Sequence, residues 1–203
     1  MQAAGGATLN TDDTPATGAA PRASRRAVSV LVAIALAGLT VDQVVKHLSV
    51  SMLDPQDPVR VLGGLVYLSL VRNSGAAFSL GSDYTFVFPL ITIVVIGWIT
   101  YMTLRLRSMP WAVALGLVLA GALGNLTDRL FRAPSFLHGH VVDMFSLFAP
   151  YGERFAVFNV ADSCLSVGVV LAVLLELTGR QRDGTRLPGN AKKHEQREEA
   201  EQR

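Results

Sequence analysis

The chain has 203 residues, of which 50% are hydrophobic and only 17% are charged, against about 25% charged residues in a typical soluble domain. This composition indicates a membrane protein, and a formal net charge of +2 is too small to suggest binding to nucleic acid. The single cysteine, Cys164, excludes an intramolecular disulfide and a cysteine-based zinc site, so we interpret it as a packing residue of an apolar helix.

Polar segments flank an apolar central region. Residues 1–24 are rich in Ala, Gly, Thr, Asp and Pro and predict a disordered tail. Residues 179–203 mix Lys, Arg and Glu and predict a second disordered tail.

The membrane domain is predicted over 25–178. A helix needs about 20 apolar residues to cross a bilayer. Four segments approach that length and predict an all-α polytopic membrane protein with spans at about 27–48, 86–104, 111–128 and 155–177.

Arginines near the ends of these segments predict their orientation. They precede the first span, join the second and third spans, and follow the fourth, as in Arg26, Arg105 and Arg180. Short segments rich in Arg and Lys stay on the cytoplasmic side of a membrane. We therefore expect both tails in the cytoplasm and the loops 49–85 and 129–154 on the outer side.

The first apolar segment has some features of a cleaved signal peptide, with arginines before an apolar run. Leu36-Ala37-Gly38 resembles the start of a lipoprotein cleavage box, but Leu39 stands where the cysteine would be. Because the helical pattern also continues beyond this point, we interpret the segment as a retained span.

The first outer loop contains a hairpin pattern. Residues 59–71 are apolar and β-branched on both sides of Gly63-Gly64. Such runs around a glycine pair are typical of two antiparallel strands joined by a tight turn. The sequence predicts a small sheet at the membrane surface.

Two charged residues lie at the outer end of the first span. Asp42 and Lys46 are spaced i, i+4 with the acid first, which favours a helical ion pair. The pair could anchor the helix end or support a functional site. Alternatively, Lys46 could extend its ammonium group to the membrane surface.

The end of the third span carries polar and small residues on one helical face. Gly121, Asn125, Asp128 and Arg129 are spaced i, i+4, i+7 and i+8. Gly121 and Gly124 would let another helix approach closely. Asn125 and Arg129 predict hydrogen bonds to a specific partner, and Arg129 could also pair with Asp128.

Two aspartates stand beside or within the last apolar run, Asp143 just before it and Asp162 inside it. An ionisable group within a span is costly unless it faces water or a partner, so it indicates function. Two adjacent carboxyl groups can share one proton, which is how aspartic proteases activate water. Asn159 precedes Asp162 by three residues and shares its helical face.

A turn motif, Asn73-Ser74-Gly75, follows the predicted hairpin. Asn and Gly favour tight turns, which accounts for Gly75. A turn does not require Asn73, whose amide could bind a substrate carbonyl.

Five short motifs, in their order and membrane setting, resemble those of the lipoprotein signal peptidase family, also called signal peptidase II. The resemblance covers about residues 27–178 and leaves both tails outside it. The motifs are Asp42-Gln43-x-x-Lys46, Asn73-x-Gly75-Ala76-Ala77-Phe78, Gly124-Asn125-x-x-Asp128-Arg129, Val141-Val142-Asp143-x-Phe145 and Phe158-Asn159-x-Ala161-Asp162.

The resemblance implies a bacterial inner-membrane enzyme of four spans with a small extracytoplasmic β-sheet cradle. Such an enzyme removes the signal peptide from prolipoproteins that carry a diacylglyceryl-modified cysteine. It implies that Asp143 and Asp162 form the catalytic dyad, with no metal and no cofactor. The implied partners are prolipoproteins and membrane lipids, and we expect a monomer.

The resemblance also assigns supporting roles. The residues implied to bind substrate or support the dyad are Asn73, Asn125, Arg129 and Asn159. Those implied to support the structure are Asp42, Lys46, Gly75, Gly121 and Gly124.

Three other functions are compatible with the same residues. Acids within spans also mark ion pathways, as in a proton-coupled carrier. A Ser–Lys peptidase would use Lys46 with one of the serines Ser69, Ser74 and Ser163. A non-enzymatic assembly factor would hold its spans together through an Asp162–Arg129 pair.

A metal site is disfavoured, although His138 and His140 form an H-x-H pattern that Asp143 could complete. Metal sites need three or more protein ligands. No further His, Cys or Glu is well placed in the sequence to supply one.

Overall fold

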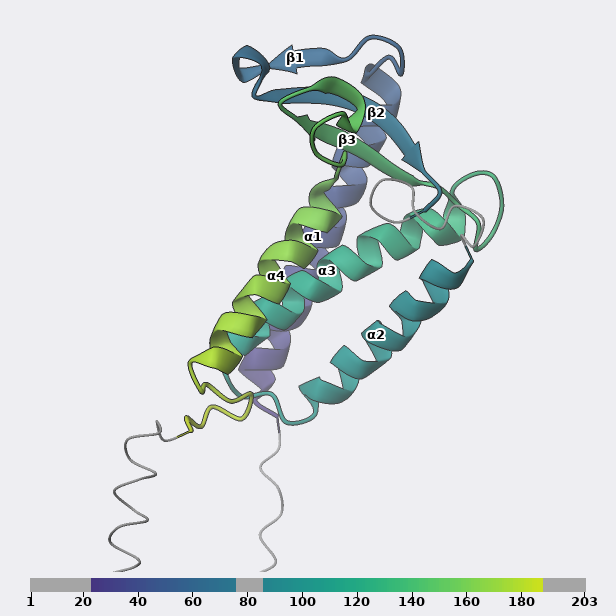
Figure 1. The fold of residues 1–203 in the computed structure, drawn as a ribbon. Coiled ribbons are helices and arrows are strands. Elements are labelled where there is room, and N and C mark those ends of the chain that lie inside the picture. The colour runs from purple at the N-terminus through teal and green to yellow at the C-terminus, as the bar shows by residue number, and fades with distance from the viewer. Residues whose placement is uncertain (1–22, 76–85, 188–203) are drawn as a thin grey trace, which may run out of the picture.

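The computed structural model describes residues 23–75 and 86–187, which fold into four helices and one three-stranded sheet. The helices are α1 (Arg25–Met52), α2 (Val87–Thr103), α3 (Met109–Phe131) and α4 (Val160–Leu177). The strands are β1 (Val59–Val61), β2 (Val66–Asn73) and β3 (Val141–Leu147), and they lie across one end of the helices (Figure 1). The prediction of a mostly helical protein with a small sheet is confirmed.

Helix α3 is the centre of the helical part, because it packs against α1, α4 and α2 (Figure 1). Glycines allow the close approach. A Cβ on Gly116 would lie 2.9 Å from the backbone oxygen of Leu31 in α1. A Cβ on Gly168 in α4 would lie 2.8 Å from the backbone nitrogen of Val118. Small residues at such contacts are how helices pack tightly within a membrane.

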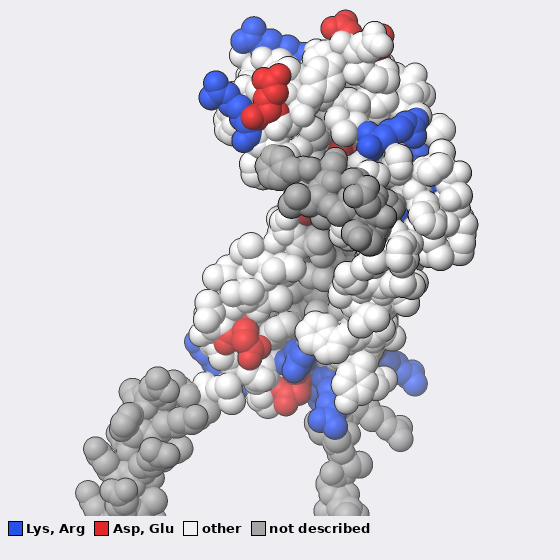
Figure 2. All heavy atoms as spheres, turned by 45° about the vertical axis from the view of Figure 1, so that its right-hand side comes forward, with Lys and Arg blue, Asp and Glu red and all other residues white. Residues whose placement is uncertain are grey.

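The outward faces of the helices are apolar. Leu36 in α1, Val94 in α2 and Val170 in α4 are 57%, 72% and 58% exposed. Most of the charged side chains in view lie near the two ends of the molecule, and the uncovered outer surface of the helices between these ends is largely uncharged (Figure 2). By length and composition α1, α3 and α4 can each cross a membrane, whereas α2 is apolar but has 17 residues.

Strands β1 and β2 form the predicted hairpin. A 3₁₀ turn, Leu62–Gly64, joins them, and its Gly63 and Gly64 adopt φ angles of 68° and 100° that favour glycine. Strand β3 pairs antiparallel with the other edge of β2. The register shifts within β2, after which Val71 lies opposite Asp143.

One face of the sheet rests on α1. Val142 and Met144 of β3 are 0% and 1% exposed, and they pack with Leu70 of β2 near Val45 of α1. Because side chains alternate across a strand, Asp143 points away from this apolar contact. The packing of β3 on the helices therefore sets the direction of the Asp143 carboxyl group.

Helix α4 begins later than the sequence predicted. The expected span began at Phe155, whereas the helix begins at Val160. Phe158 instead forms an antiparallel bridge with Phe145 of β3, and its backbone nitrogen donates to the Phe145 oxygen at 3.0 Å. The first residues of the predicted span are apolar because this part of the chain pairs with the sheet, and only the residues from Val160 onward are helical. As a result, Asp162 lies in the first turn of α4.

The segment that follows α4 is folded against the opposite end of the helices. The Arg182 oxygen accepts hydrogen bonds from the backbone nitrogens of Arg107 and Ser108, at 2.9 and 3.0 Å, just before α3 begins. The Trp111 indole donates to the Arg180 oxygen at 2.7 Å. The disorder predicted for the C-terminal tail therefore does not extend to 179–187. The rest of that tail, and residues 1–22 of the N-terminal tail, lie outside the described residues.

Candidate active site

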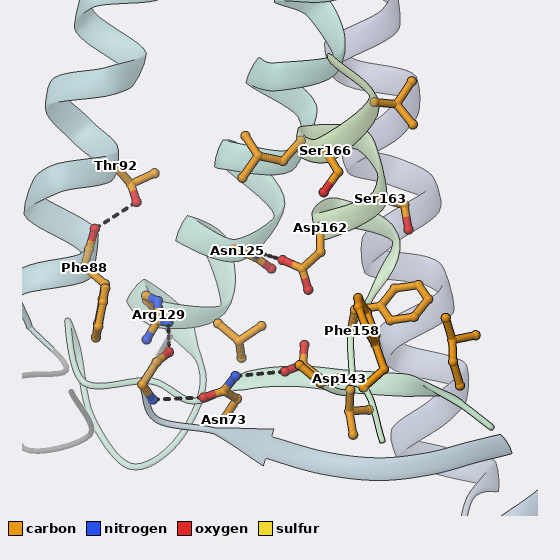
Figure 3. A pocket seen from close by; sticks show the side chains of 18 residues that line it. Asn73, Phe88, Thr92, Asn125, Arg129, Asp143, Phe158, Asp162, Ser163 and Ser166 are labelled. Carbon is orange, nitrogen blue, oxygen red and sulfur yellow. Dashed lines mark hydrogen bonds between the residues drawn. The ribbon is translucent and has the colours of Figure 1, made fainter. Parts of the chain in front are cut away.

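Asp143 and Asp162 point into the same cavity from different elements. Asp143 lies within β3 and Asp162 in the first turn of α4, and their carboxyl groups face one another (Figure 3). Asp143 is 2% exposed. The fold therefore brings together the two acids that the sequence singled out.

The cavity has a volume of about 750 Å³, within the usual range for sites that bind small ligands. The lining residues come from β2 and the turn after it, from β3, α2, α3 and α4, and from residues 155–158 before α4. Polar side chains gather near the sheet, while Phe88 of α2 and Leu165 and Val167 of α4 contribute apolar lining. The site thus combines a polar end with an apolar wall.

Asn159 and Asp162 form a reciprocal cap at the start of α4. The Asp162 backbone nitrogen donates to the Asn159 side-chain oxygen at 2.9 Å, and the Asn159 backbone nitrogen donates to Asp162 Oδ2 at 3.1 Å. This capping box satisfies two backbone donors that a helix start leaves free. It also fixes the side chains of both residues.

Asp143 accepts hydrogen bonds from two asparagine amides. Asn159 Nδ2 donates to Oδ1 at 2.6 Å, and Asn73 Nδ2 donates to Oδ2 at 3.1 Å. The orientation of Asn73 is set by its own side-chain oxygen, which accepts from the Gly75 backbone nitrogen at 3.0 Å. The predicted turn at Gly75 thus holds Asn73 toward the acid (Figure 3).

Asp162 is bound in a similar way. Asn125 Nδ2 in α3 donates to Asp162 Oδ1 at 2.7 Å, and the other carboxyl oxygen accepts from the backbone at Asn159. Each oxygen of the two carboxyl groups therefore has at least one nitrogen donor. Neutral amides supply the side-chain donors, so they orient the acids without adding charge.

The electrostatic surroundings disfavour two ionised acids at once. Burial, followed by the negative charge of Asp162, raises the pKa of Asp143 to about 7. Hydrogen bonds from Asn73 and Asn159 and the positive charge of Lys46 act in the opposite direction. A pair that holds one proton near neutral pH is the state that these surroundings favour.

Arg129 binds the backbone that leads into the segment 76–85, which lies outside the described residues. Its guanidinium donates to the Gly75 oxygen at 2.6 Å and to the Ser74 oxygen at 3.5 Å. It also lies 4.8 Å from the centre of the Phe88 ring. Among the described residues it forms no ion pair with Asp128 or Asp162, so the sequence-based pairing with Asp128 is wrong.

Lys46 and Asp42 form a buried ion pair, and both are 0% exposed. The ammonium group lies 2.9 Å from Asp42 Oδ2, 2.9 Å from Asp128 Oδ2 and 3.0 Å from Asn125 Oδ1. Lys46 therefore does not reach the membrane surface, and that alternative is wrong. Asp42 Oδ1 also accepts from the Ala161 backbone nitrogen at 2.8 Å, so the pair joins α1 to α3 and α4.

The predicted glycines lie where helices meet. A Cβ on Gly121 would collide with the Ala161 oxygen and with Leu165 of α4. A Cβ on Gly124 would lie 2.8 Å from the Ala161 Cβ. Both positions require the absence of a side chain, as helix packing predicted.

Two residues that were not among the predicted site residues belong to the polar network. Asp128 accepts from Lys46, from Arg132 at 2.6 Å and from the Val142 backbone nitrogen at 3.1 Å. Gln43 donates to Asp42 and to Asp128, at 3.1 and 3.3 Å. The sequence contained a signal for including Asp128 in the site, because Asp128 follows Asn125 by three residues and shares its helical face.

The contacts bear on two alternatives raised by the sequence. The ammonium of Lys46 has three donors, and two carboxylates and one amide oxygen take them, which disfavours a role as the base of a serine nucleophile. Ser163 donates to the Asn159 oxygen at 3.0 Å. The ion pair that an assembly factor would use does not form, since the Arg129 guanidinium bonds to backbone oxygens.

Comparison with known proteins places this site in a family. The model of the family described as signal peptidase (SPase) II matches residues 34–178, which include both aspartates and most of the chain. The chain belongs to the signal peptidase II family. Its members are aspartic-type peptidases, so this chain is a membrane hydrolase.

Relatives in the signal peptidase II family cover most of the chain. The lipoprotein signal peptidase of Streptomyces coelicolor is 45% identical over 161 residues, 79% of this chain and 76% of that protein. That of Mycolicibacterium smegmatis is 44% identical over 179 residues, 87% of this chain and 74% of that protein. A solved bacterial membrane enzyme, 31% identical, superposes with a TM-score of 0.64 over 74% of this chain and 94% of the other.

Proposed function

We propose that this protein removes the signal peptide from diacylglyceryl-modified prolipoproteins by hydrolysing the peptide bond just before the lipidated cysteine. The observation that carries the proposal is the pair of facing carboxyl groups, Asp143 and Asp162, in a chain that belongs to the signal peptidase II family. An aspartic dyad needs only water as its second reactant, with no metal and no cofactor.

In the proposed mechanism Asp162 is the ionised base and Asp143 the protonated acid. Asp162 lies in the first turn of α4, where the helix dipole favours a negative charge. Asp143 keeps its proton near neutral pH because burial and the neighbouring acid raise its pKa to about 7. The two carboxyl groups together then carry one proton.

Hydrolysis follows in two stages. Asp162 takes a proton from water as the oxygen attacks the scissile carbonyl carbon, while Asp143 donates its proton to the carbonyl oxygen. The tetrahedral intermediate then collapses, the C–N bond breaks, and the proton held by Asp162 passes to the leaving amine. Asp143 recovers its proton from the intermediate, so the dyad returns to its starting state.

The asparagines and Arg129 are proposed to hold the reacting groups in place. Asn73 and Asn159 orient Asp143, and Asn125 orients Asp162. Arg129 binds the backbone at Gly75 and is proposed to shape the substrate-facing rim of the cavity. Preorganised dipoles of this kind lower the barrier because they need no reorganisation during the reaction.

The substrate is proposed to enter from the lipid between α2 and α4. Both helices line the cavity with apolar residues, among them Phe88 and Val167, and their outer faces are exposed. The signal peptide is itself an apolar helix and can lie along this wall, while the acyl chains stay in the bilayer. Binding energy from these remote parts can position the scissile bond.

We infer a bacterial inner-membrane protein of four spans, with both termini in the cytoplasm, the sheet outside and the site near the outer face. Figure 2 shows Lys and Arg side chains at the end of the helices far from the sheet. Arg105 and Arg107 lie between α2 and α3, and Arg182 follows α4, so these arginines support the orientation. With this arrangement α2 is the shortest span and crosses with its flanking residues. The protein is proposed to act as a monomer.

The test compares the wild-type protein with Asp143→Asn and Asp162→Asn in detergent, using a diacylglyceryl-modified precursor and the same precursor without lipid. The wild type should cleave only the lipidated form. Each variant should insert into membranes normally and lose at least about 100-fold in rate, because each lacks one proton-transfer group. Near-normal cleavage by either variant would show that the dyad is assigned incorrectly.

A further inference from the structure

The ammonium group of Lys46 is fully buried and fully used. Its three donors point to Asp42, Asp128 and Asn125 at 2.9, 2.9 and 3.0 Å, and the side chain is 0% exposed. Two of these contacts neutralise the carboxylates of Asp42 and Asp128. The third contact joins Lys46 directly to a side chain that holds Asp162.

The contact with Lys46 fixes which way the Asn125 amide faces. An ammonium group only donates, so it must meet the oxygen of the amide and not its nitrogen. The opposite end of the amide, Nδ2, then faces Asp162 and donates to it at 2.7 Å. The Asn159 amide also donates to Asn125 Oδ1 at 3.1 Å, which holds the same orientation from α4.

The charge of Lys46 also acts on the dyad. Its positive charge lowers the pKa of Asp143, the acid that lies in β3. In the described part of the chain, the other charged groups near the dyad are Asp42 on α1 and Asp128 and Arg129 on α3. The two cations differ in what they bind. Lys46 donates to the Asn125 amide, which in turn donates to Asp162, whereas Arg129 donates to the Gly75 backbone oxygen.

We propose that Lys46 is a positioning residue of the hydrolytic reaction, which holds the Asn125 amide in the orientation that binds Asp162 and balances the charge of the singly ionised dyad. This role rests on the proposed function and goes beyond support of the fold. It acts through Asn125, so Lys46 itself does not touch the substrate.

A variant that tests this role must not leave a buried acid without a partner. Lys46→Met alone would do so, and breaking a buried ion pair is strongly destabilising. The double variant Asp42→Asn/Lys46→Met removes one positive and one negative charge. The oxygen of asparagine can still accept from the Ala161 backbone nitrogen, and Asp128 keeps Arg132 and Val142 as partners. A second balanced pair, Asp128→Asn/Lys46→Met, serves if the first does not fold.

The experiment measures Tm, kcat, KM and the pH dependence of kcat with the lipidated precursor. If Lys46 positions the dyad, the folded double variant should lose about 10- to 100-fold in kcat, as expected for loss of one charge-assisted hydrogen bond. KM should change less than about threefold, because the cavity wall is unaltered. The pH at which activity falls on the alkaline side should rise by about half a unit or more, because the charge that lowers the Asp143 pKa is gone.

A folded double variant with wild-type kcat and an unshifted pH profile would overturn the proposal and leave Lys46 as a neutralising partner only. A change confined to KM would overturn it as well. If the wild type itself failed to cleave the lipidated precursor, the proposed function would be wrong instead, so the two failures are distinguishable.

Discussion

Gly124 and Asp42 are in such close contact that a Cβ on the glycine would lie 2.6 Å from the carboxylate oxygen Oδ2. That oxygen is also the one that binds Lys46. The backbone of α3 therefore forms one wall of the buried polar network.

We expect Gly124→Ala to destabilise the protein by about 1–3 kcal/mol, the usual cost of overpacking a close contact. Gly97→Ala in α2 is the matched control, because a Cβ there would meet nothing within 4 Å among the described residues. The control should be neutral or up to about 1 kcal/mol more stable, since alanine favours helix. Unfolding in detergent measures both, and equal effects would contradict the role of the contact.

Two substitutions at Asn159 should distinguish its role in stability from its role in activity. Asn159→Ser keeps an oxygen that can cap α4 but loses the amide that donates to Asp143, whereas Asn159→Ala loses both. The alanine variant should be about 1 kcal/mol less stable than the serine variant, the usual value of a helix cap. Both should lose about 10-fold or more in kcat. If the serine variant had wild-type kcat, Asn159 would act only as a cap.

The rate of cleavage should fall on the alkaline side of about pH 7. Asp143 is proposed to donate a proton, and its pKa is raised from the ordinary value near 4 to about 7. The acid is therefore protonated below that pH and loses its proton above it, so kcat should fall about tenfold per pH unit on the alkaline limb. A profile that stayed flat to pH 9 would contradict the assignment of Asp143 as the acid.

Asp128 should matter more for stability than its ion-pair partner Arg132. Asp128→Ala would leave Lys46 with one carboxylate and remove the acceptor for the Val142 backbone nitrogen, so we expect a loss of about 3 kcal/mol or more. Arg132 is 24% exposed at its side chain, and Arg132→Ala should cost about 1 kcal/mol or less. Equal losses in urea unfolding would mean that the buried contacts of Asp128 contribute little.

Apolar patterns in the sequence located the helices, and the Gly63-Gly64 pair located the hairpin. The beginning of α4 was misplaced because residues 155–158 are as apolar as a span, and only the pairing of Phe158 with Phe145 shows that they extend the sheet. The spacing of Asn159 and Asp162 fits a helix-start signal, which would have given the correct boundary.

The two acids and most of the polar residues around them could be singled out because such side chains are unusual in apolar segments. The burial of Lys46 could not be predicted from the sequence in the same way. Its partners Asn125 and Asp128 lie on another helix, and the hydrogen bond to Asn125 joins positions 79 residues apart. A single helix pattern cannot distinguish a lysine that reaches water from one enclosed by a distant segment.

The bond between Asp42 and the Ala161 backbone joins positions 119 residues apart, and it has a consequence for biosynthesis. Helix α1 emerges from the ribosome first, yet its acid meets this donor only when the last helix has been inserted. Until then Asp42 lacks the Ala161 backbone amide, and water or Lys46 on its own helix must satisfy the carboxylate. Premature termination before α4 would thus yield a polypeptide that lacks Asp162 and leaves Asp42 without this bond.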